Sequence, residues 1–390
     1  MKKTLIAVLL GVFLLQAGAA ALSGMPAFGR KYSLSCKTCH APFPRLKPYG
    51  EEFAGEGFVI KDKESPRYFQ DTGDSLLSLL RDIPLALRLD GFLSFNNAGT
   101  GRFDFNAPYI LKVLSGGELF KNVAYYFYFF FSERGEVAGI EDAFVMFNNV
   151  LRTGLDITLG QFQISDPLFK RELRLTLEDY QVYRARPGLS GINLTYDRGL
   201  MLNFSLPTST DLTVEVLNGS GIGPADADRN FDHDAFKNFA FHISQNLGAK
   251  IRLGGFAFLG RERLGDFRNT VRMFGLDATV ASPPFEFNFQ YLERRDDDPY
   301  FVGAVDDSLS TRGALAELIY LPRGDDSRWY GVGLVNWVVS DSEELDYFSF
   351  TGGGGYLLRR NMRLVAEVTY YDQSPWGRYF RLAAGLVTAF

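Results

Sequence analysis

Apolar and polar residues alternate one by one along most of the chain after residue 83. In 284–292, for example, Phe and Tyr residues alternate with Glu, Asn and Gln, and 211–216 and 361–371 follow the same pattern. A period of two is typical of a β-strand with one apolar and one polar face. Such segments recur up to the C-terminus between Gly, Asp, Asn and Pro turns, which predicts an all-β chain of about 16 strands.

The last of these segments is amphipathic and ends on Phe390, the final residue of the chain. Even numbers of antiparallel strands with an apolar, aromatic outer face are typical of bacterial outer-membrane barrels. We therefore predict a transmembrane antiparallel β-barrel over residues 83–390, a fold in which the apolar faces meet lipid. A soluble secreted β-sandwich or propeller is the alternative, although such folds bury their aromatic face.

The first 21 residues have the composition of a secretory signal peptide. Lys2 and Lys3 precede the apolar run Thr4–Leu15, and small residues follow from Ala17 to Ala21. This order predicts cleavage near Ala19 or Ala21 and export of the protein, with an uncleaved N-terminal anchor as the alternative. No later stretch reaches 18 consecutive apolar residues, so we expect no transmembrane helix.

Composition narrows the class of protein further. Hydrophobic residues make up 46% of the 390 residues and aromatic residues 15%, a content that excludes a disordered chain. The formal net charge of −5, with 41 basic against 46 acidic residues, argues against a nucleic-acid-binding protein. Only two cysteines are present, which excludes a fold built on several disulfides.

Both cysteines belong to one motif, Cys36-Lys37-Thr38-Cys39-His40. C-x-x-C-H is the attachment motif of c-type haem. Two thiols at this spacing reach the two vinyl groups on one edge of the porphyrin, and the adjacent His then lies under the ring as an iron ligand. We therefore predict one covalently attached haem c, bound by Cys36 and Cys39, with His40 as an axial ligand.

Three other interpretations of the motif stay open. A C-x-x-C disulfide oxidoreductase would be expected within a thioredoxin-like βαβ unit, which the strand pattern lacks. A zinc site would need further ligands, and His40, His233 and His242 are the only histidines. The third alternative is a plain structural disulfide.

Residues 22–62 form a compact cassette around the motif, and residues 63–82 read as a linker to the barrel. Five apolar residues of the cassette are expected to pack on the porphyrin: Phe28, Phe43, Leu46, Phe53 and Phe58. Four basic residues are expected to pair with its propionates: Arg30, Lys37, Arg45 and Lys47. A segment of roughly 40 residues rarely folds alone, so we expect the cassette to dock into the barrel and to plug its lumen.

The second axial ligand would set the redox potential, since Met raises it relative to His. Strand parity places His242, Met201 and Met273 on faces that point into the lumen, and Met25 lies within the cassette. These four residues are the candidates, and the sequence does not choose among them.

The cassette resembles a known family. It has P-x-F-x-R before the motif and P-x-L-x-x-x-G-x-x-F after it, and the matching positions are Pro26, Phe28, Arg30, Cys36, Cys39, His40, Pro44, Leu46, Gly50 and Phe53. Together with a porin ending in Phe, this arrangement is similar to the fused monohaem cytochrome c–porins of the bacterial outer membrane. The best-known members are iron oxidases that take electrons from extracellular ferrous iron.

The resemblance implies electron transfer between an extracellular donor or acceptor, such as a metal ion, and a periplasmic cytochrome or other carrier. It places the protein in the bacterial outer membrane, with the haem cassette on the periplasmic side or within the barrel lumen. The alternative is a passive porin for small solutes with the cassette as plug or gate. Basic residues on expected lumenal faces, Lys250, Arg252 and Arg363, favour that alternative. We find no catalytic triad and no phosphate-binding loop that would predict another enzyme activity.

Overall fold

The computed structural model describes residues 26–60, 70, 72–74, 76–234, 236–303 and 308–390. The predicted signal peptide, Met25 and much of the predicted linker lie outside the described residues. Within the described ranges, no helix combines the length and hydrophobicity needed to cross a membrane.

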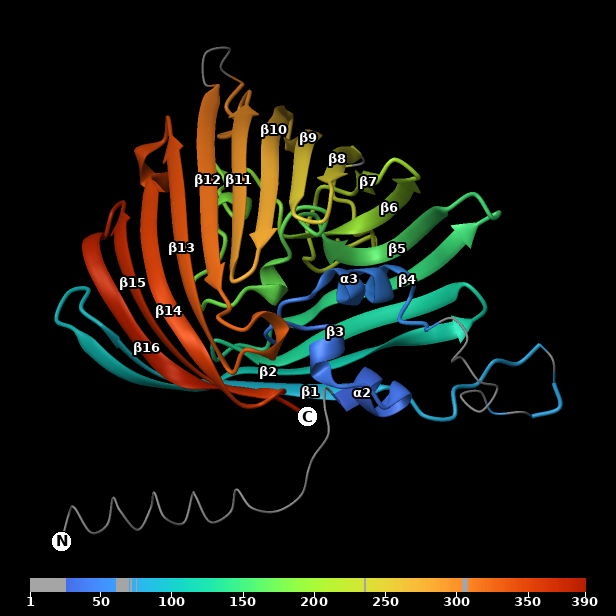
Figure 1. Cartoon of the computed structure of the whole chain (residues 1–390). Helices are drawn as coiled ribbons and strands as arrows, with labels where there is room; N and C mark the ends of the chain where they lie inside the picture. The colour runs from blue at the N-terminus through green and yellow to red at the C-terminus, as the bar shows by residue number, and fades with distance from the viewer. Residues whose placement is uncertain (1–25, 61–69, 71, 75, 235, 304–307) are drawn as a thin grey trace, which may run out of the picture.

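Sixteen antiparallel strands form one closed barrel. Each strand pairs with its neighbours along the chain, and β1 pairs with β16 to close the wall (Figure 1). The strands are β1 (Leu85–Asn96), β2 (Arg102–Phe120), β3 (Val123–Glu133), β4 (Gly139–Val150), β5 (Leu155–Gln163), β6 (Tyr196–Leu206), β7 (Thr210–Leu217), β8 (Asn238–Leu247), β9 (Ile251–Leu264), β10 (Phe267–Ser282), β11 (Phe285–Asp296), β12 (Leu309–Tyr320), β13 (Trp329–Ser340), β14 (Tyr347–Arg359), β15 (Met362–Gln373) and β16 (Gly377–Ala389). The prediction of an all-β barrel with about 16 strands is confirmed.

Alternation along each strand separates an outer from an inner surface. In β15, Leu364 and Val368 are 46% and 51% exposed, whereas Arg363, Glu367 and Thr369 are buried inside. A slip of one residue would reverse these faces, so the apolar pattern fixes the register. The outer surface is therefore apolar, as expected of a barrel wall that meets lipid.

The two ends of the barrel differ in the length of their connections. At the end that holds the C-terminus, 121–122 join β2 to β3 and 360–361 join β14 to β15. At the opposite end, 164–195 join β5 to β6 and 218–237 join β7 to β8. In outer-membrane barrels the short turns face the periplasm and the long loops face outward, so the C-terminal end of this barrel corresponds to the periplasmic end of such barrels.

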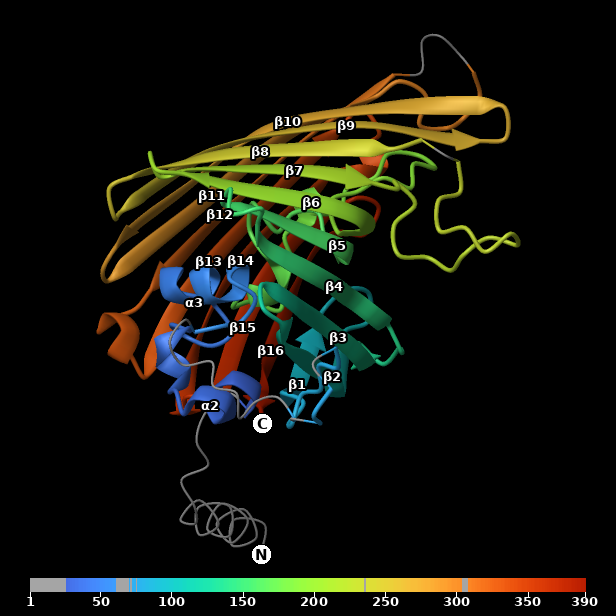
Figure 2. The same ribbon diagram turned by 90° about the vertical axis from the view of Figure 1, so that its right-hand side faces the viewer.

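The cassette lies at this short-turn end. It contains α2 (Pro26–Tyr32), the 3₁₀ turn η2 (Cys36–Thr38) and α3 (Pro48–Gly55). Figure 2 shows both helices at the end of the barrel where the C-terminus lies. A guanidinium nitrogen of Arg30 donates to the carbonyl oxygen of Leu85 over 2.5 Å, and the Asn148 amide donates to that of Gly55 over 2.6 Å. The cassette is thereby joined to β1 and β4.

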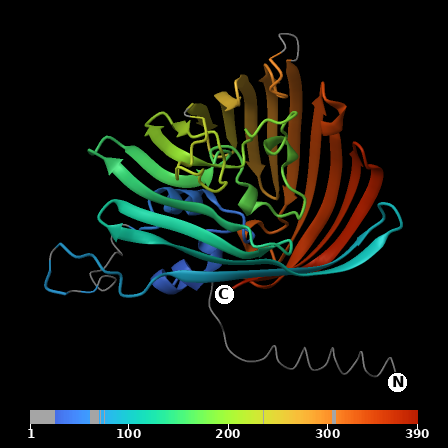
Figure 3. The same cartoon turned by 180° about the vertical axis from the view of Figure 1, so that it is seen from behind.

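A second segment fills the lumen, which the sequence did not lead us to expect. Residues 164–195, here called the inner loop, leave the wall after β5 and return to it at β6 (Figure 3). The loop contains two short 3₁₀ turns, η4 (Arg171–Leu173) and η5 (Gln181–Tyr183). One buried apolar cluster joins the loop to the walls of β5 through β13, and its loop members are Ile164, Leu168, Tyr180, Val182, Tyr183, Ile192 and Leu194. The plug is therefore made of both the cassette and the inner loop.

Candidate functional site

A cavity of about 370 Å³ lies between the cassette, one side of the barrel wall and the inner loop. Its volume is within the range of about 300–1,000 Å³ that is common for small-molecule and cofactor pockets. Cys36, Cys39 and His40 all line it. The five apolar cassette residues expected to pack on a porphyrin also line it: Phe28, Phe43, Leu46, Phe53 and Phe58. The lining is therefore mainly apolar where the motif enters the cavity.

Local backbone structure brings the three motif residues together. Cys36 begins η2 and Cys39 caps it, and the His40 amide donates to the Cys36 carbonyl over 2.9 Å. Side chains three residues apart in a 3₁₀ turn lie on the same side, so both thiols point the same way. Gly50 of α3 packs against this turn, because a Cβ atom there would clash with the Cys39 carbonyl oxygen.

The imidazole of His40 has one defined proton position. Its Nδ1 lies 2.8 Å from the Pro44 carbonyl oxygen and 3.3 Å from that of Arg45. A carbonyl oxygen only accepts, so Nδ1 donates the proton and Nε2 keeps its lone pair. Burial lowers the pKa of His40, although the two backbone bonds act in the opposite direction, and the ring is neutral at pH 7. Metal-binding histidines characteristically donate their other ring N–H in this way.

Burial and a neighbouring charge act in opposite directions on the Cys39 thiol. Its pKa is raised, first by burial, while the charge of Lys47 acts in the opposite direction. A disulfide oxidoreductase would be expected to carry the motif in a thioredoxin-like βαβ unit. The described strands instead form one closed barrel in which every strand pairs with its neighbours along the chain, so this context is absent from the described residues. Among the residues that the structure describes, no group of three or more His, Cys, Asp or Glu side chains could hold a metal ion, as a zinc site would require.

The basic residues of the cassette contact the barrel. Lys37 forms an ion pair with Asp326 over 3.0 Å, Lys47 pairs with Asp325, and Arg45 pairs with Glu286. None of these lysines and arginines, nor Arg30, is among the described residues that line the cavity. Acidic groups of the barrel rim bind three of them, so their expected pairing with haem propionates stays a prediction.

The positive charges that do line the cavity come from the wall and the inner loop. They are Arg88, Lys112 and Lys170. Each lies beside a carboxylate: Arg88 pairs with Asp90 over 2.7 Å, Lys112 with Glu172 over 2.7 Å and Lys170 with Asp166 over 2.9 Å. Lys112 also lies 4.2 Å from the centre of the Tyr128 ring. Sequence reasoning missed these residues because their shared location depends on pairing between distant strands.

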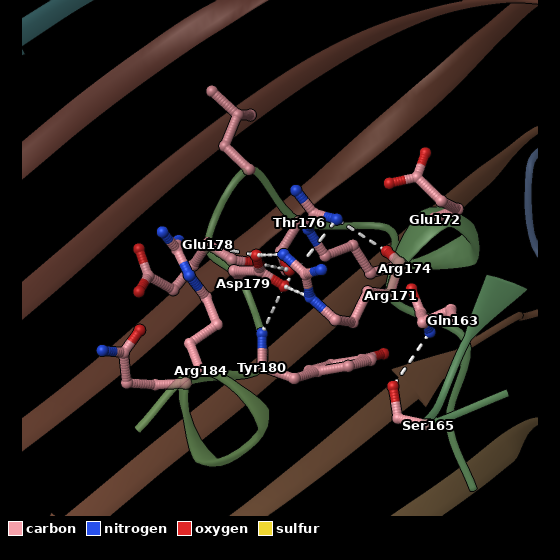
Figure 4. A network of polar contacts seen from close by, with 12 residues as sticks. Gln163, Ser165, Arg171, Glu172, Arg174, Thr176, Glu178, Asp179, Tyr180 and Arg184 are labelled. Carbon is pink, nitrogen blue, oxygen red and sulfur yellow. Dashed lines mark hydrogen bonds and ion pairs between the residues drawn. The ribbon is translucent and has the colours of Figure 1, made fainter. Parts of the chain in front are cut away.

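The inner loop is organised around one carboxylate, that of Asp179 (Figure 4). Arg171 donates to it through two nitrogens, and Arg174 and Arg184 lie 3.9 and 3.7 Å away. Burial would raise the pKa of Asp179, but the three guanidinium groups outweigh it and hold the pKa far below its usual value. The barrel wall also contacts Asp179, because the Asn336 amide donates to the Asp179 carbonyl oxygen over 2.9 Å.

Hydrogen bonds join the inner loop to the remaining side of the barrel wall. The carboxylate of Glu178 accepts from Tyr371 over 2.6 Å and from Arg381 over 3.2 Å, and it also accepts from Tyr347. The Leu177 amide donates to Glu367 over 2.7 Å. These bonds reach β14, β15 and β16, whereas the apolar cluster reaches β5 through β13. The inner loop thus contacts the wall on opposite sides of the lumen.

Two of the basic residues that favoured the passive-porin alternative form hydrogen bonds with the inner loop or the wall. Arg252 donates to the carbonyl oxygen of Pro167 over 2.9 Å, and Arg363 donates to the Tyr330 hydroxyl. Lys250 is exposed in the turn between β8 and β9. These positions do not form a basic row along an open pore.

The four candidates for the second axial ligand differ in whether they line the cavity. Met201 is buried and lines the cavity. His242 and Met273 are buried in the lumen, as strand parity predicts, but neither is among the described residues lining the cavity. The Nε2 atom of His242 lies 2.8 Å from a carboxylate oxygen of Asp277, and Met273 belongs to the apolar cluster of the inner loop. Met25 lies outside the described residues.

Sequence reasoning missed one further thioether. Met146 of β4 is buried and lines the same cavity. It lies on the inner face with Asp142 and Phe144, which also line the cavity, so the alternation of β4 was the available signal.

No family model matches the sequence, and no curated protein matches it. Solved outer-membrane porins share its fold. An anion-selective porin from Comamonas acidovorans aligns with a TM-score of 0.61 at 10% identity, over 79% of this chain and 99% of the porin. The trimer form of OmpT from Vibrio cholerae gives 0.56 at 10% identity, over 79% and 99%. OmpF of Salmonella typhi, in complex with daunomycin, gives 0.56 at 12% identity, over 79% and 97%. At these identities the comparison shows a porin-like 16-strand barrel.

Proposed function

We propose that this protein transfers electrons across the bacterial outer membrane through one haem c. In this proposal Cys36 and Cys39 hold the haem by thioether bonds and His40 binds its iron from the cassette side. The main support is the convergence of these three side chains on one large apolar cavity. The proton position of His40 adds to it, because Nε2 keeps a lone pair for the metal.

The residues around the cavity fit the proposed cofactor. Phe28, Phe53 and Phe58 supply an apolar surface for a flat ring, and Tyr126 of β3 stacks on Phe58 with ring centres 5.3 Å apart. The bound haem would supply a one-electron carrier. The cassette, strands β1 to β6 and the inner loop together would exclude water from it, and solvent exposure and hydrogen bonding are among the factors that set a haem potential.

The position of the cassette suggests how the two reactants approach. The hydrocarbon band of the outer membrane is about 25 Å tall, so a haem at one rim does not span it alone. A periplasmic electron carrier would meet the cassette at the short-turn end, where Tyr49, Glu51 and Glu52 are exposed. An extracellular donor or acceptor, with ferrous iron as the candidate that the family resemblance suggests, would enter from the long-loop end.

A passive porin for small solutes is the second candidate function. The fold that this chain shares with solved porins favours it. The inner loop counts against it, because a buried apolar cluster and the bonds of Glu178 tie the loop to opposite walls. A steady open current through haem-loaded protein in a planar bilayer would favour the porin.

The proposal is tested on full-length protein made in cells that attach c-type haem. Denatured wild-type protein should keep a haem that comigrates with the polypeptide, with one haem per chain. The double variant C36A/C39A should lose it while still forming a folded barrel in detergent. Wild-type protein without covalent haem would refute the proposal.

A further inference from the structure

Two thioethers lie on one row across neighbouring strands. Met146 of β4 pairs with Thr158 of β5, and Thr158 pairs with Met201 of β6. All three residues line the cavity that holds the motif, and the two methionines are the only ones among its described lining residues. Two methionine side chains of the wall therefore line the space proposed for the haem.

The described part of the cassette offers no comparable ligand. Residues 26–60 contain no methionine, and His40 is their only histidine. Tyr32 donates its hydroxyl to the Phe58 carbonyl over 2.9 Å, and Lys37 and Lys47 are paired with Asp326 and Asp325. Each of these three side chains would have to give up its contact in order to bind the iron.

Met146 lies closer than Met201 to the place where the cassette contacts the barrel wall. Asn148, two residues further along the inner face of β4, donates to the Gly55 carbonyl over 2.6 Å. Ala124, which pairs with Met146, would lie 2.6 Å from a Cβ atom placed on Gly57. The cassette backbone therefore approaches the wall beside Met146, whereas Met201 packs in the apolar cluster of the inner loop.

We infer that Met146 of the barrel wall is the second axial ligand of the haem iron. This inference rests on the haem of the proposed function. Methionine is unbranched and flexible, so its sulfur can move toward a metal without displacement of the strand. A barrel ligand would also lock the cassette to the wall. Because Met raises the potential of a haem relative to His, the site would suit electron uptake from a weak reductant.

The test compares M146L with M201L, a matched change on the same row. Covalent haem is measured first in all variants, because a wild-type protein without haem would remove the proposed function and this inference together. In haem-loaded M146L, the near-infrared absorption of methionine-ligated ferric haem should disappear. The ferrous form should gain rapid carbon monoxide binding, and the midpoint potential should fall. M201L should keep the wild-type values of all three.

A spectrum, carbon monoxide binding and potential unchanged in M146L would overturn the inference, as would their loss in M201L alone. M146H provides a second variant in case M146L does not fold. It should keep a six-coordinate haem that excludes carbon monoxide and should have a lower potential than the wild type. A wild-type potential in M146H would contradict ligation by Met146.

Discussion

The Nδ1 atom of His40 lies 2.8 Å from the carbonyl oxygen of Pro44. An isolated antiparallel bridge between His40 and Leu46 returns the chain so that this carbonyl meets the ring. The bond leaves Nε2 unprotonated, which is the state that binds a metal. The chain between the motif and α3 thus leaves His40 in the protonation state that the proposed haem iron would need.

We expect H40A to lose its haem ligation while H233A keeps it. His233 lies in an exposed loop and contacts the Pro224 carbonyl at 3.2 Å, so it serves as a control of the same residue type. The measurement is the haem absorption spectrum of the purified protein, and we expect the spectrum of a haem with both axial ligands in H233A but not in H40A. Equal haem content and spectra in the two variants would contradict the assignment of His40.

We expect the Arg45–Glu286 ion pair to hold the cassette in the barrel. Both side chains are largely buried, so E286Q would leave the Arg45 charge poorly compensated and weaken docking by about 2–3 kcal/mol. D326N removes an exposed partner of Lys37 and should have little effect. Limited proteolysis of the cassette measures the difference. Equal cleavage rates in E286Q and D326N would show that this pair does not secure docking.

The pair of Lys112 and Glu172 should make the stability of the inner loop depend on pH. Burial alone would raise the pKa of Glu172, but the charges of Lys112 and Arg174 lower it from 4.5 to about 2. Because the folded pKa is lowered, this carboxylate stabilises the protein above pH 4.5. That contribution, roughly 3 kcal/mol, is lost as the pH falls from 4.5 to about 2.

Urea unfolding at pH 7 and at pH 3 tests this dependence. The wild type should lose more stability between the two values than E172Q, in which the titrating group is gone. E343Q, a change in an exposed loop, should behave as the wild type. An unchanged pH dependence in E172Q would assign the acid sensitivity to other groups.

The inner loop should keep the barrel closed to ions. Glu178 binds the wall through Tyr347, Tyr371 and Arg381, so E178A should loosen the loop and produce current openings in a planar bilayer. The wild type and E343A should show no steady current. A large steady current in the wild type would favour the passive porin instead.

The alternation of residues predicted much of this fold. It gave the strands and placed Met201, His242 and Met273 on the inner surface, because side-chain direction along a strand depends only on local parity. The alternation did not predict which side chains of the inner surface lie close to one another. Met146 and Met201 share a cavity because β4, β5 and β6 pair in one register, and the hydrophobic pattern of a single strand does not contain that register.

The periodic pattern of the sequence gave no sign of the inner loop or of the ion pairs that join the cassette to the barrel. The loop is held by polar contacts such as those of Asp179, which are specific to the folded state. Its length was the available indication, because loops longer than about 12–15 residues are commonly functional. The partners of Lys37 and Lys47 lie almost 300 residues away, in the connection between β12 and β13, so the local sequence held no signal for these ion pairs.

The central claim is that electrons cross the membrane through this protein, and liposomes containing the haem-loaded protein test it most directly. Ferrous iron is supplied outside and an oxidised cytochrome is enclosed inside, with an enclosed small dye to report leakage. The expected result is reduction of the enclosed cytochrome by the wild type, without dye release, and none with C36A/C39A. No reduction by the wild type, or equal reduction by C36A/C39A, would contradict the claim.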